Sequence, residues 1–336
     1  MNVGNAVRSL YRAVRPHPKS RAVVLMYHRV AECDIDPWNM CVSPLQFADQ
    51  IAALKRKFCI LPLHDLIHSE ARRNAVAITF DDGYADNLHA AAPILEHHGA
   101  PACFFLTSGA LDMTHEFWWD ELARLLLREA ALPSTIIISV GSRRHFEPGR
   151  AAEPAMDLRG QIRANPPWKA GPNTRLGFFY LIWRAFRVLD EQARRTALDE
   201  IAVQLAGDSG TRASHRTLTS MEAQRLAGIP GIEIGAHSVT HAVLPSLNPE
   251  AQSREIGDAK RDLEKLLGRP ITGFAYPFGD YGAETADLVR AAGFELACTT
   301  ETGGITRKTD RFRLPRLGVE ECDGQQLVRR ATELLG

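Results

Sequence analysis

Short apolar runs alternate with longer amphipathic segments along most of the 336-residue chain. The runs have the length of strands and predict strands at 22–27, 58–61, 75–80, 101–106, 232–236, 272–276 and 294–298, with a weaker one at 312–315. Helical periodicity predicts helices at 44–57, 85–98, 249–267 and 284–292, with Gly99, Gly268 and Gly293 where helices should end. Repeated strand–helix units favour a parallel sheet, and seven or eight of them favour a (β/α) barrel.

One region interrupts this alternation. Residues 112–219 read as helices with a short strand at 136–140 and a Pro/Gly-rich patch at 165–172. We therefore expect an α/β barrel over residues 22–320, divided by a mainly helical insertion at 112–219. Residues 1–21 are interpreted as an N-terminal tail, and residues 321–336 as a C-terminal helix.

Composition narrows the possible partners. Lys+Arg and Asp+Glu number 40 each, so the chain lacks the basic excess of a nucleic-acid-binding protein. The six cysteines show no CxxC spacing, and we predict free, buried thiols instead of a zinc knuckle or a disulfide framework. The cysteines are Cys33, Cys41, Cys59, Cys103, Cys298 and Cys322.

The N-terminal segment gives no sign of export. Its apolar run at 22–27 is shorter than a secretory signal requires, and the longest apolar run elsewhere is far below the ~20 residues of a membrane span. We predict a cytoplasmic protein without a transmembrane segment. Val7, Leu10, Tyr11 and Val14 could form an amphipathic helix in peripheral contact with a membrane, and a solvated tail is the simpler alternative.

Polar residues follow four of the predicted strands. His28 comes after the first, Asp81-Asp82 after 75–80, His237–His241 after 232–236, and Tyr276–Gly279 after the strand near 272. Because parallel strands of an α/β barrel end at one common face, these side chains should meet in one cleft.

His237 and His241 have i,i+4 spacing, which would place them on one face of a first helical turn. Such spacing alone is typical of any helix surface. Together with one carboxylate, however, two imidazoles make a three-ligand site suited to catalytic zinc or to ferrous iron. A cation also explains the adjacent acids, since one carboxylate can bind it while the other stays ionised as a base. The alternative for Asp81-Asp82 is a loop with one capping and one solvated aspartate.

Three segments resemble signature motifs of the polysaccharide deacetylases: TFDDGY at 79–84, HSVTH at 237–241 and FAYPFG at 274–279. These are carbohydrate esterases with the chitooligosaccharide deacetylase (NodB homology) fold, a deformed (β/α) barrel. The resemblance implies metal-dependent removal of N-acetyl groups from an amino-sugar glycan or glycan precursor. It further implies Asp81 as general base and Asp82, His237 and His241 as ligands of a divalent metal, zinc or another first-row ion.

The third motif also implies a substrate groove. Tyr276, Pro277 and Phe278 resemble the groove wall, where a backbone N–H helps to stabilise an oxyanion. FAYPFG is closest in style to the poly-N-acetylglucosamine deacetylase branch. Trp38, in the loop after the first strand, is a further candidate for substrate contact.

The chain departs from the family at two positions. Ala275 replaces an arginine that orients the base in many relatives, and we expect Arg316 to lie near Asp81 in its stead. No histidine follows His241, so the general acid that many relatives take from a C-terminal Leu-x-His motif does not exist here. His28 is the predicted acid, by analogy with the poly-N-acetylglucosamine branch.

Other residues receive simpler interpretations. Phe117-Trp118-Trp119-Asp120 could supply an aromatic platform for a sugar ring, but we expect it to anchor a helix to the core. Arg184, Arg187, Arg194 and Arg195 are expected to form a solvated helix face. The sequence leaves open whether the sugar is a polymer, a lipid-linked intermediate or a nucleotide sugar. Two other functions remain as alternatives: a catalytically silent sugar-binding relative, and an iron oxygenase with two histidines and one carboxylate.

Overall fold

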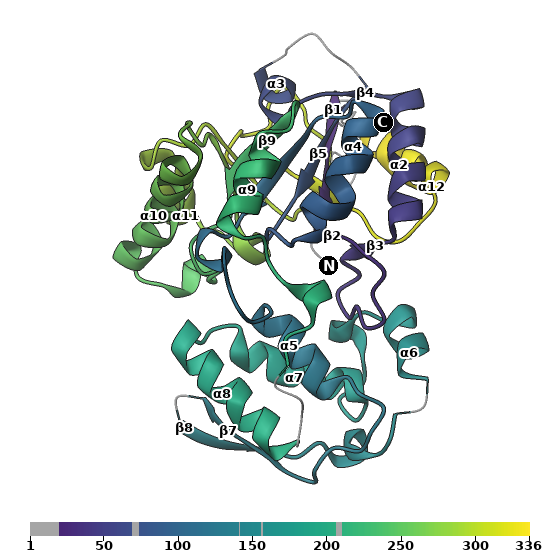
Figure 1. Ribbon diagram of the computed structural model, residues 1–336, viewed down its shortest axis with the longest axis vertical. Coiled ribbons are helices and arrows are strands. Elements are labelled where there is room, and N and C mark those ends of the chain that lie inside the picture. Colours follow the sequence, from purple (N-terminus) through teal and green to yellow (C-terminus); the bar gives the residue numbers. More distant parts are fainter. Residues whose placement is uncertain (1–19, 69–73, 141, 156, 206–209) are drawn as a thin grey trace, which may run out of the picture.

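The computed structural model describes residues 20–68, 74–140, 142–155, 157–205 and 210–336. The chain forms two lobes, an upper one from its two ends and a lower one from its middle (Figure 1). The predicted membrane-contacting segment within residues 1–19 lies outside the described residues. Among the described helices, none has the length and apolar character needed to cross a bilayer.

The upper lobe is built on a parallel barrel sheet. The strand order is β11-β10-β9-β6-β5-β1-β12, and β4 also pairs with the start of β5. A bridge between Cys298 and Leu314 brings the two ends of this order together. The predicted (β/α) barrel is therefore confirmed. The strands are β1 (Ala22–Tyr27), β4 (Cys59–Ile60), β5 (Ala75–Phe80), β6 (Ala102–Leu106), β9 (Ile232–Ala236), β10 (Gly273–Ala275), β11 (Leu296–Cys298) and β12 (Arg316–Gly318).

The weaker predicted strand at 312–315 is wrong. Leu314 makes only the single bridge to β11, and the ladder to β1 begins at the pair Val24–Arg316. The strand β12 (Arg316–Gly318) thus starts with a charged residue, which apolar patterning does not single out.

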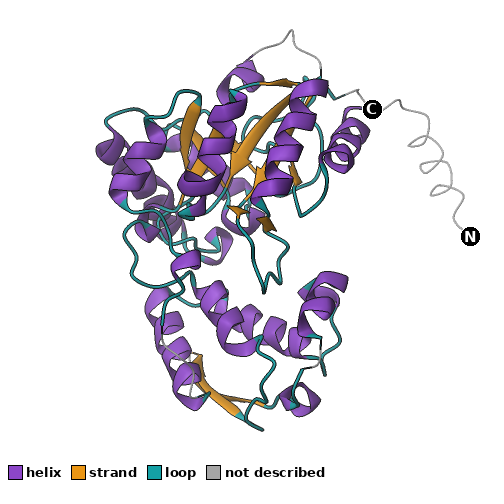
Figure 2. Cartoon of the chain, turned by 45° about the vertical axis from the view of Figure 1, so that its right-hand side comes forward, coloured by secondary structure: helices purple, strands orange, loops and turns teal. Residues whose placement is uncertain are grey.

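Helices cover the outside of this barrel (Figures 1 and 2). The predicted helix at 85–98 begins as a π-helix and continues as α4, ending at Gly99 in the left-handed conformation. Helix α12 packs beside α2. The elements are α2 (Pro44–Lys57), α3 (Leu63–His68), η1 (Asn87–Ala91), α4 (Ala92–His98), η2 (Ser108–Ala110), α9 (Ser220–Ala227), η6 (Leu244–Ser246), α10 (Pro249–Leu267), η7 (Pro277–Gly279), α11 (Ala283–Ala291) and α12 (Gly324–Leu335).

The lower lobe has a hydrophobic core of its own, separate from that of the barrel. Its predicted strand at 136–140 is present and pairs in antiparallel fashion with a second strand. Arg175 is buried in this lobe and donates to several backbone carbonyls, including those of Ala151 and Glu153. The elements are α5 (Trp118–Leu126), β7 (Ile136–Val140), β8 (Ser142–Phe146), η3 (Gly149–Ala152), α6 (Leu158–Ala164), η4 (Pro167–Lys169), α7 (Arg175–Phe186), α8 (Glu191–Gln204) and η5 (Ala213–His215).

The prediction of six free thiols is wrong for two of them, because Cys33 and Cys41 form a disulfide. Strands β2 (Arg29–Val30) and β3 (Cys41–Val42) pair in parallel and fold the intervening loop back on itself. The two Cα atoms consequently lie 6.3 Å apart, within the range that a disulfide spans. The spacing of the two cysteines in the sequence does not reveal that the loop brings them together. The other four cysteines lie outside the disulfide, and only Cys103 and Cys298 among them are buried.

Candidate active site

The two adjacent aspartates are turned apart by the backbone at the end of β5. Asp81 continues the strand, and its N–H donates to the carbonyl of Tyr27 at 3.0 Å. Asp82 has φ of 75° and Gly83 has φ of 92°, so the chain turns sharply here. A Cβ at position 83 would meet the Leu106 side chain at 3.1 Å, which makes glycine the fitting residue. The turn therefore sends the two carboxylates to different partners.

The two histidines flank a non-helical loop after β9, so the predicted helical turn is wrong. Ser238 and His241 have positive φ values of 61° and 54°, and the His241 N–H donates to Ser238 Oγ at 3.0 Å. Glu255 on α10 accepts hydrogen bonds from the Val239 and Thr240 amides. These side-chain bonds replace the backbone bonds that a helical turn would make, and they hold the loop in a shape that brings both imidazoles inward.

Asp82, His237 and His241 converge on one point. Asp82 Oδ1 lies 3.4 Å from His237 Nε2 and 3.2 Å from His241 Nε2, and all three side chains are buried. His237 Nδ1 lies 2.8 Å from the carbonyl oxygen of Ala275, which fixes the tautomer with a free lone pair on Nε2. Burial lowers the pKa of His241 to about 4, so this imidazole is neutral.

This donor set fits a divalent metal ion. Asp82 Oδ1 has no hydrogen-bond partner among the described residues, although it is fully enclosed. One carboxylate oxygen and two imidazole nitrogens within 4.8 Å of one another are the ligands of a catalytic zinc or related ion. Burial raises the pKa of Asp82, yet the two imidazoles outweigh it and leave the pKa below its ordinary value.

Asp81 is held by Arg316, as the sequence predicted. Arg316 donates from Nη1 and Nη2 to the two carboxylate oxygens at 2.7 and 2.6 Å, and from Nε to the carbonyl of Thr299. Burial raises the pKa of Asp81, but the charge and the hydrogen bonds of Arg316 outweigh burial and lower the pKa below its ordinary value. Many relatives have an arginine at the position of Ala275. In this chain Arg316 of β12 contacts Asp81 in its place.

Two further predicted residues lie at this site. His28 directly follows β1, and the register that pairs Tyr27 with Phe80 brings its backbone next to that of Asp81. Phe278 adopts φ of 59° and places its ring 4.5 Å from that of His241. Within Pro277–Phe278 only Phe278 has an amide N–H to offer an oxyanion.

Tyr276 does not line a groove, contrary to the prediction. Its side chain is fully buried in the barrel core, and its hydroxyl donates to the carbonyl of Phe312 at 3.0 Å. Its backbone N–H is also used, in a bond to the carbonyl of Cys298. Strand alternation turns this residue inward, whereas Pro277 and Phe278 follow the end of the strand.

The insertion covers the three candidate metal ligands with aromatic residues. The ring of Trp119 lies 4.7 Å from that of His241, and Trp183 lies 5.9 Å from Phe278. The predicted groove residue Trp38 packs against Trp183 at 4.6 Å, so the loop after β2 also meets the insertion. The site therefore lies between the barrel and the insertion.

For the aromatic cluster of the insertion, sequence reasoning preferred a helix anchor to a wall of the site, and Trp119 contradicts that preference. Trp118 does anchor its helix by packing on Phe186, but its neighbour Trp119 reaches His241. The predicted solvated arginine face is wrong in part, since Arg194 is only 5% exposed and Arg187 lies 4.7 Å above the Phe278 ring. A cluster of aromatic residues in an insertion is the one available signal, and it does not distinguish a helix anchor from a site wall.

Comparison with known proteins gives the same family as the motifs. The sequence model described as polysaccharide deacetylase matches residues 68–131 and 213–297, on both sides of the insertion. YxkH of Bacillus subtilis (strain 168), assigned to the polysaccharide deacetylases, is 28% identical over 110 residues. That alignment spans 33% of this chain and 39% of the length of YxkH.

Solved structures extend the likeness in fold. Streptococcus pyogenes deacetylase PplD, in complex with acetate, aligns with a TM-score of 0.58 and 16% identity, over 94% of this chain and 99% of PplD. IcaB from Ammonifex degensii aligns with a TM-score of 0.57 and 15% identity, over 94% of this chain and 98% of IcaB. The chain is thus similar to the polysaccharide deacetylases in sequence on both sides of the insertion and in the fold of the barrel.

Proposed function

We propose that this protein is a metal-dependent N-deacetylase that hydrolyses the acetamide of an amino sugar in a glycan or glycan precursor. The products are acetate and a free amine. One observation carries the proposal: two adjacent buried carboxylates face different partners, Asp82 the two imidazoles and Asp81 a guanidinium. Such a division provides one metal ligand and one separate base.

Asp82, His237 and His241 would hold the ion, with zinc as the proposed metal. When bound, a divalent metal polarises a carbonyl and lowers the pKa of water to about 7. Asp81 then accepts the proton of the attacking water. Arg316 keeps Asp81 ionised and fixes the plane of its carboxylate through two hydrogen bonds.

The leaving amine needs a proton, because an amide anion is a poor leaving group. His28 is the proposed donor, since it directly follows β1, which pairs with the strand that leads into Asp81. The N–H of Phe278 is the proposed donor to the oxyanion that develops on the acetamide. A donor in such a position contributes about 3–4 kcal/mol when preorganised.

The two alternative functions, an iron oxygenase and a catalytically silent sugar-binding protein, are less well supported. The iron oxygenases considered there use a double-sheet β fold, whereas this chain is a parallel barrel, and Asp81 would have no role in that chemistry. A silent sugar-binding relative would not need the paired Asp81 and Arg316, and here both are buried and hydrogen-bonded to each other.

We retain the cytoplasm as the proposed location. The Cys33–Cys41 disulfide argues against this location, because disulfides persist mainly in oxidising compartments and not in the cytosol. The redox state of this pair in the native host therefore tests the location independently of activity.

The decisive experiment is an acetate-release screen on a panel of N-acetylated polymers, lipid-linked sugars and nucleotide sugars, with metal content measured in the same preparation. We expect acetate from at least one substrate, loss of release after chelation, and recovery on adding zinc. A protein that carries stoichiometric metal yet releases no acetate from any member would contradict the proposal.

A further inference from the structure

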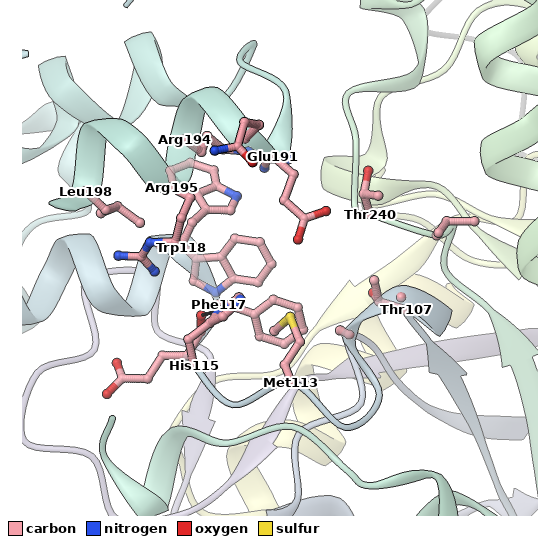
Figure 3. A pocket seen from close by; sticks show the side chains of 16 residues that line it. Thr107, Met113, His115, Phe117, Trp118, Glu191, Arg194, Arg195, Leu198 and Thr240 are labelled. Carbon is pink, nitrogen blue, oxygen red and sulfur yellow. Dashed lines mark hydrogen bonds between the residues drawn. The ribbon is translucent and has the colours of Figure 1, made fainter. Parts of the chain in front are cut away.

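A cavity lies between the insertion and the barrel, next to the proposed metal ligands. Figure 3 shows the side chains that line it. Its volume is about 350 Å³, within the range of small-ligand sites. Its walls come from α5, the first half of α8 and the loops after β6 and β9. Trp119 lines the cavity and also contacts His241 at 4.7 Å, so the cavity and the metal-binding site share a wall.

Two buried N–H donors in the cavity wall lack acceptors. Arg194 is 5% exposed and Trp118 is 9% exposed. Neither Arg194 Nε nor Trp118 Nε1 has a hydrogen-bond partner among the described residues. The guanidinium carbon of Arg194 lies 5.5 Å from the centre of the Trp118 ring, so the two donors are neighbours. Because burying an unpartnered donor costs free energy, the cavity is suited to a ligand that supplies acceptors.

The charge of Arg194 points to the kind of acceptor. In the described part of the chain, Arg194 has no carboxylate within ion-pair distance, whereas the adjacent Arg195 pairs with Glu121 and Asp199. Burial lowers the pKa of Arg194, but a guanidinium remains charged near neutral pH. Glu191, Glu255 and Asp190 act on Arg194 only from beyond ion-pair distance, so the described residues leave this buried cation without a direct ion pair. Arginine binds carboxylate and phosphoryl groups particularly well.

The remaining wall suits a sugar. Phe117, Trp118 and Trp119 present aromatic faces, against which the C–H faces of a pyranose ring can pack. Glu191 is exposed at the rim and turns its carboxylate toward the cavity, where sugar hydroxyls can donate to it (Figure 3). Aromatic, acidic and basic groups are therefore arranged for a saccharide with a negative charge at one end.

We propose that this cavity binds an anionic group, a carboxylate or a phosphoryl group, on the saccharide whose acetamide reaches Asp81 and the metal ligands. Arg194 is its charged partner and Trp118 Nε1 a second donor. The inference rests on the proposed deacetylase function and narrows its substrate to acidic or phosphorylated amino-sugar compounds.

Binding by the metal-loaded protein tests this without turnover. Calorimetry would compare N-acetylglucosamine, N-acetylglucosamine 1-phosphate and a disaccharide of N-acetylglucosamine with glucuronate. We expect at least one of the two anionic sugars to bind roughly tenfold more tightly than the neutral sugar, and which one does so identifies the anionic group. Arg194→Met should abolish this preference, and Trp118→Phe, which keeps an aromatic ring but removes the N–H, should reduce it several-fold.

Arg184→Met is the matched control, because Arg184 is an exposed arginine of the same insertion on α7, and it should leave the preference unchanged. Equal binding of all three sugars, or a preference that survives both Arg194→Met and Trp118→Phe, overturns the inference. The deacetylase proposal is tested separately by acetate release, so a protein that binds anionic sugars through Arg194 but releases no acetate would disprove only that proposal.

Discussion

Arg316 donates two hydrogen bonds to the carboxylate of Asp81, at 2.7 and 2.6 Å, although the two residues are 235 positions apart in the sequence. Both side chains are buried, at 0% and 2% exposure. The fixed fork of a guanidinium matches both oxygens of a carboxylate, which a lysine ammonium cannot do. The base of the proposed reaction is thus ionised and oriented by the strand β12 that closes the barrel.

Replacing this arginine should change the pH dependence of the reaction. In the wild type the pKa of Asp81 is lowered, so the carboxylate stays ionised as the pH falls through the ordinary range for aspartate. In Arg316→Met, burial acts without this counter-charge and the pKa rises. The acidic limb of kcat/KM should therefore move to higher pH, with a larger loss of activity at pH 5 than at pH 8. A variant that loses the same fraction at both values would show that Arg316 does not act through the ionisation of Asp81.

Substituting the proposed base and substituting a proposed metal ligand should have different effects on metal content. Asp81→Asn keeps the shape of the side chain and leaves Asp82, His237 and His241 in place, so metal should remain while kcat falls at least a hundredfold. His237→Ala removes a ligand and should lose both metal and activity. Elemental analysis of dialysed protein, together with acetate release, measures both. Near-normal turnover by Asp81→Asn would disprove the assignment of the base.

His28 should govern the alkaline limb of the rate profile. A general acid must be protonated to act, so activity falls as the pH rises through its pKa. His28→Ala should lower kcat by about 10²–10⁴-fold and remove that limb, and His28→Gln is a control that retains a hydrogen-bonding side chain without the acid. If turnover and the alkaline limb are both unchanged in His28→Ala, another group donates the proton.

Asp120 should make the stability of the protein depend on pH. Its carboxylate accepts a hydrogen bond from the Tyr84 hydroxyl at 2.7 Å, and burial raises its pKa to about 7 against the opposing charge of Arg29. The unfolded chain has an ordinary value of about 3.9, so the folded state binds the extra proton between these two values. This contribution to stability is present below pH 4 and is lost as the pH rises to about 7.

Asp120→Asn removes the titrating group while keeping an acceptor for Tyr84. Relative to the wild type, the variant should therefore gain stability on going from pH 5 to pH 8, as urea unfolding at the two values would measure. Asp258→Asn, at a partly exposed carboxylate on α10, is the control and should show no such trend. A difference between Asp120→Asn and the wild type that is constant with pH would show that Asp120 does not titrate in this range.

The Cys33–Cys41 disulfide gives a prediction that needs no substrate. Protein unfolded without reductant should show four reactive thiols, from Cys59, Cys103, Cys298 and Cys322, and full reduction should reveal all six. Cys41→Ser should lower the free energy of unfolding by about 2 kcal/mol, because the unfolded loop is no longer constrained. Cys59→Ser, at an exposed cysteine outside the disulfide, is the control. Six reactive thiols in protein purified from its native host would mean that the pair is reduced there.

Local patterns in the sequence predicted much of the barrel. The bounds predicted for β1, β5 and β9 coincide with the observed Ala22–Tyr27, Ala75–Phe80 and Ile232–Ala236. Buried parallel strands are continuous apolar runs, and polar residues at their ends are easily recognised. The same rule predicted that Asp82, His237 and His241 lie in one site. These features depend on neighbouring residues alone.

The tertiary structure decided what depends on contacts between distant segments. It placed Arg316 on Asp81, closed the Cys33–Cys41 loop, turned Tyr276 into the core and brought Trp119 of the insertion beside His241. The sequence determined which side chains lie at strand ends, because apolar runs and their periodicity can be recognised in short segments of the chain. The packing of one lobe on the other determined which of them are charged, covered or free to meet a ligand, because those properties depend on residues far along the chain.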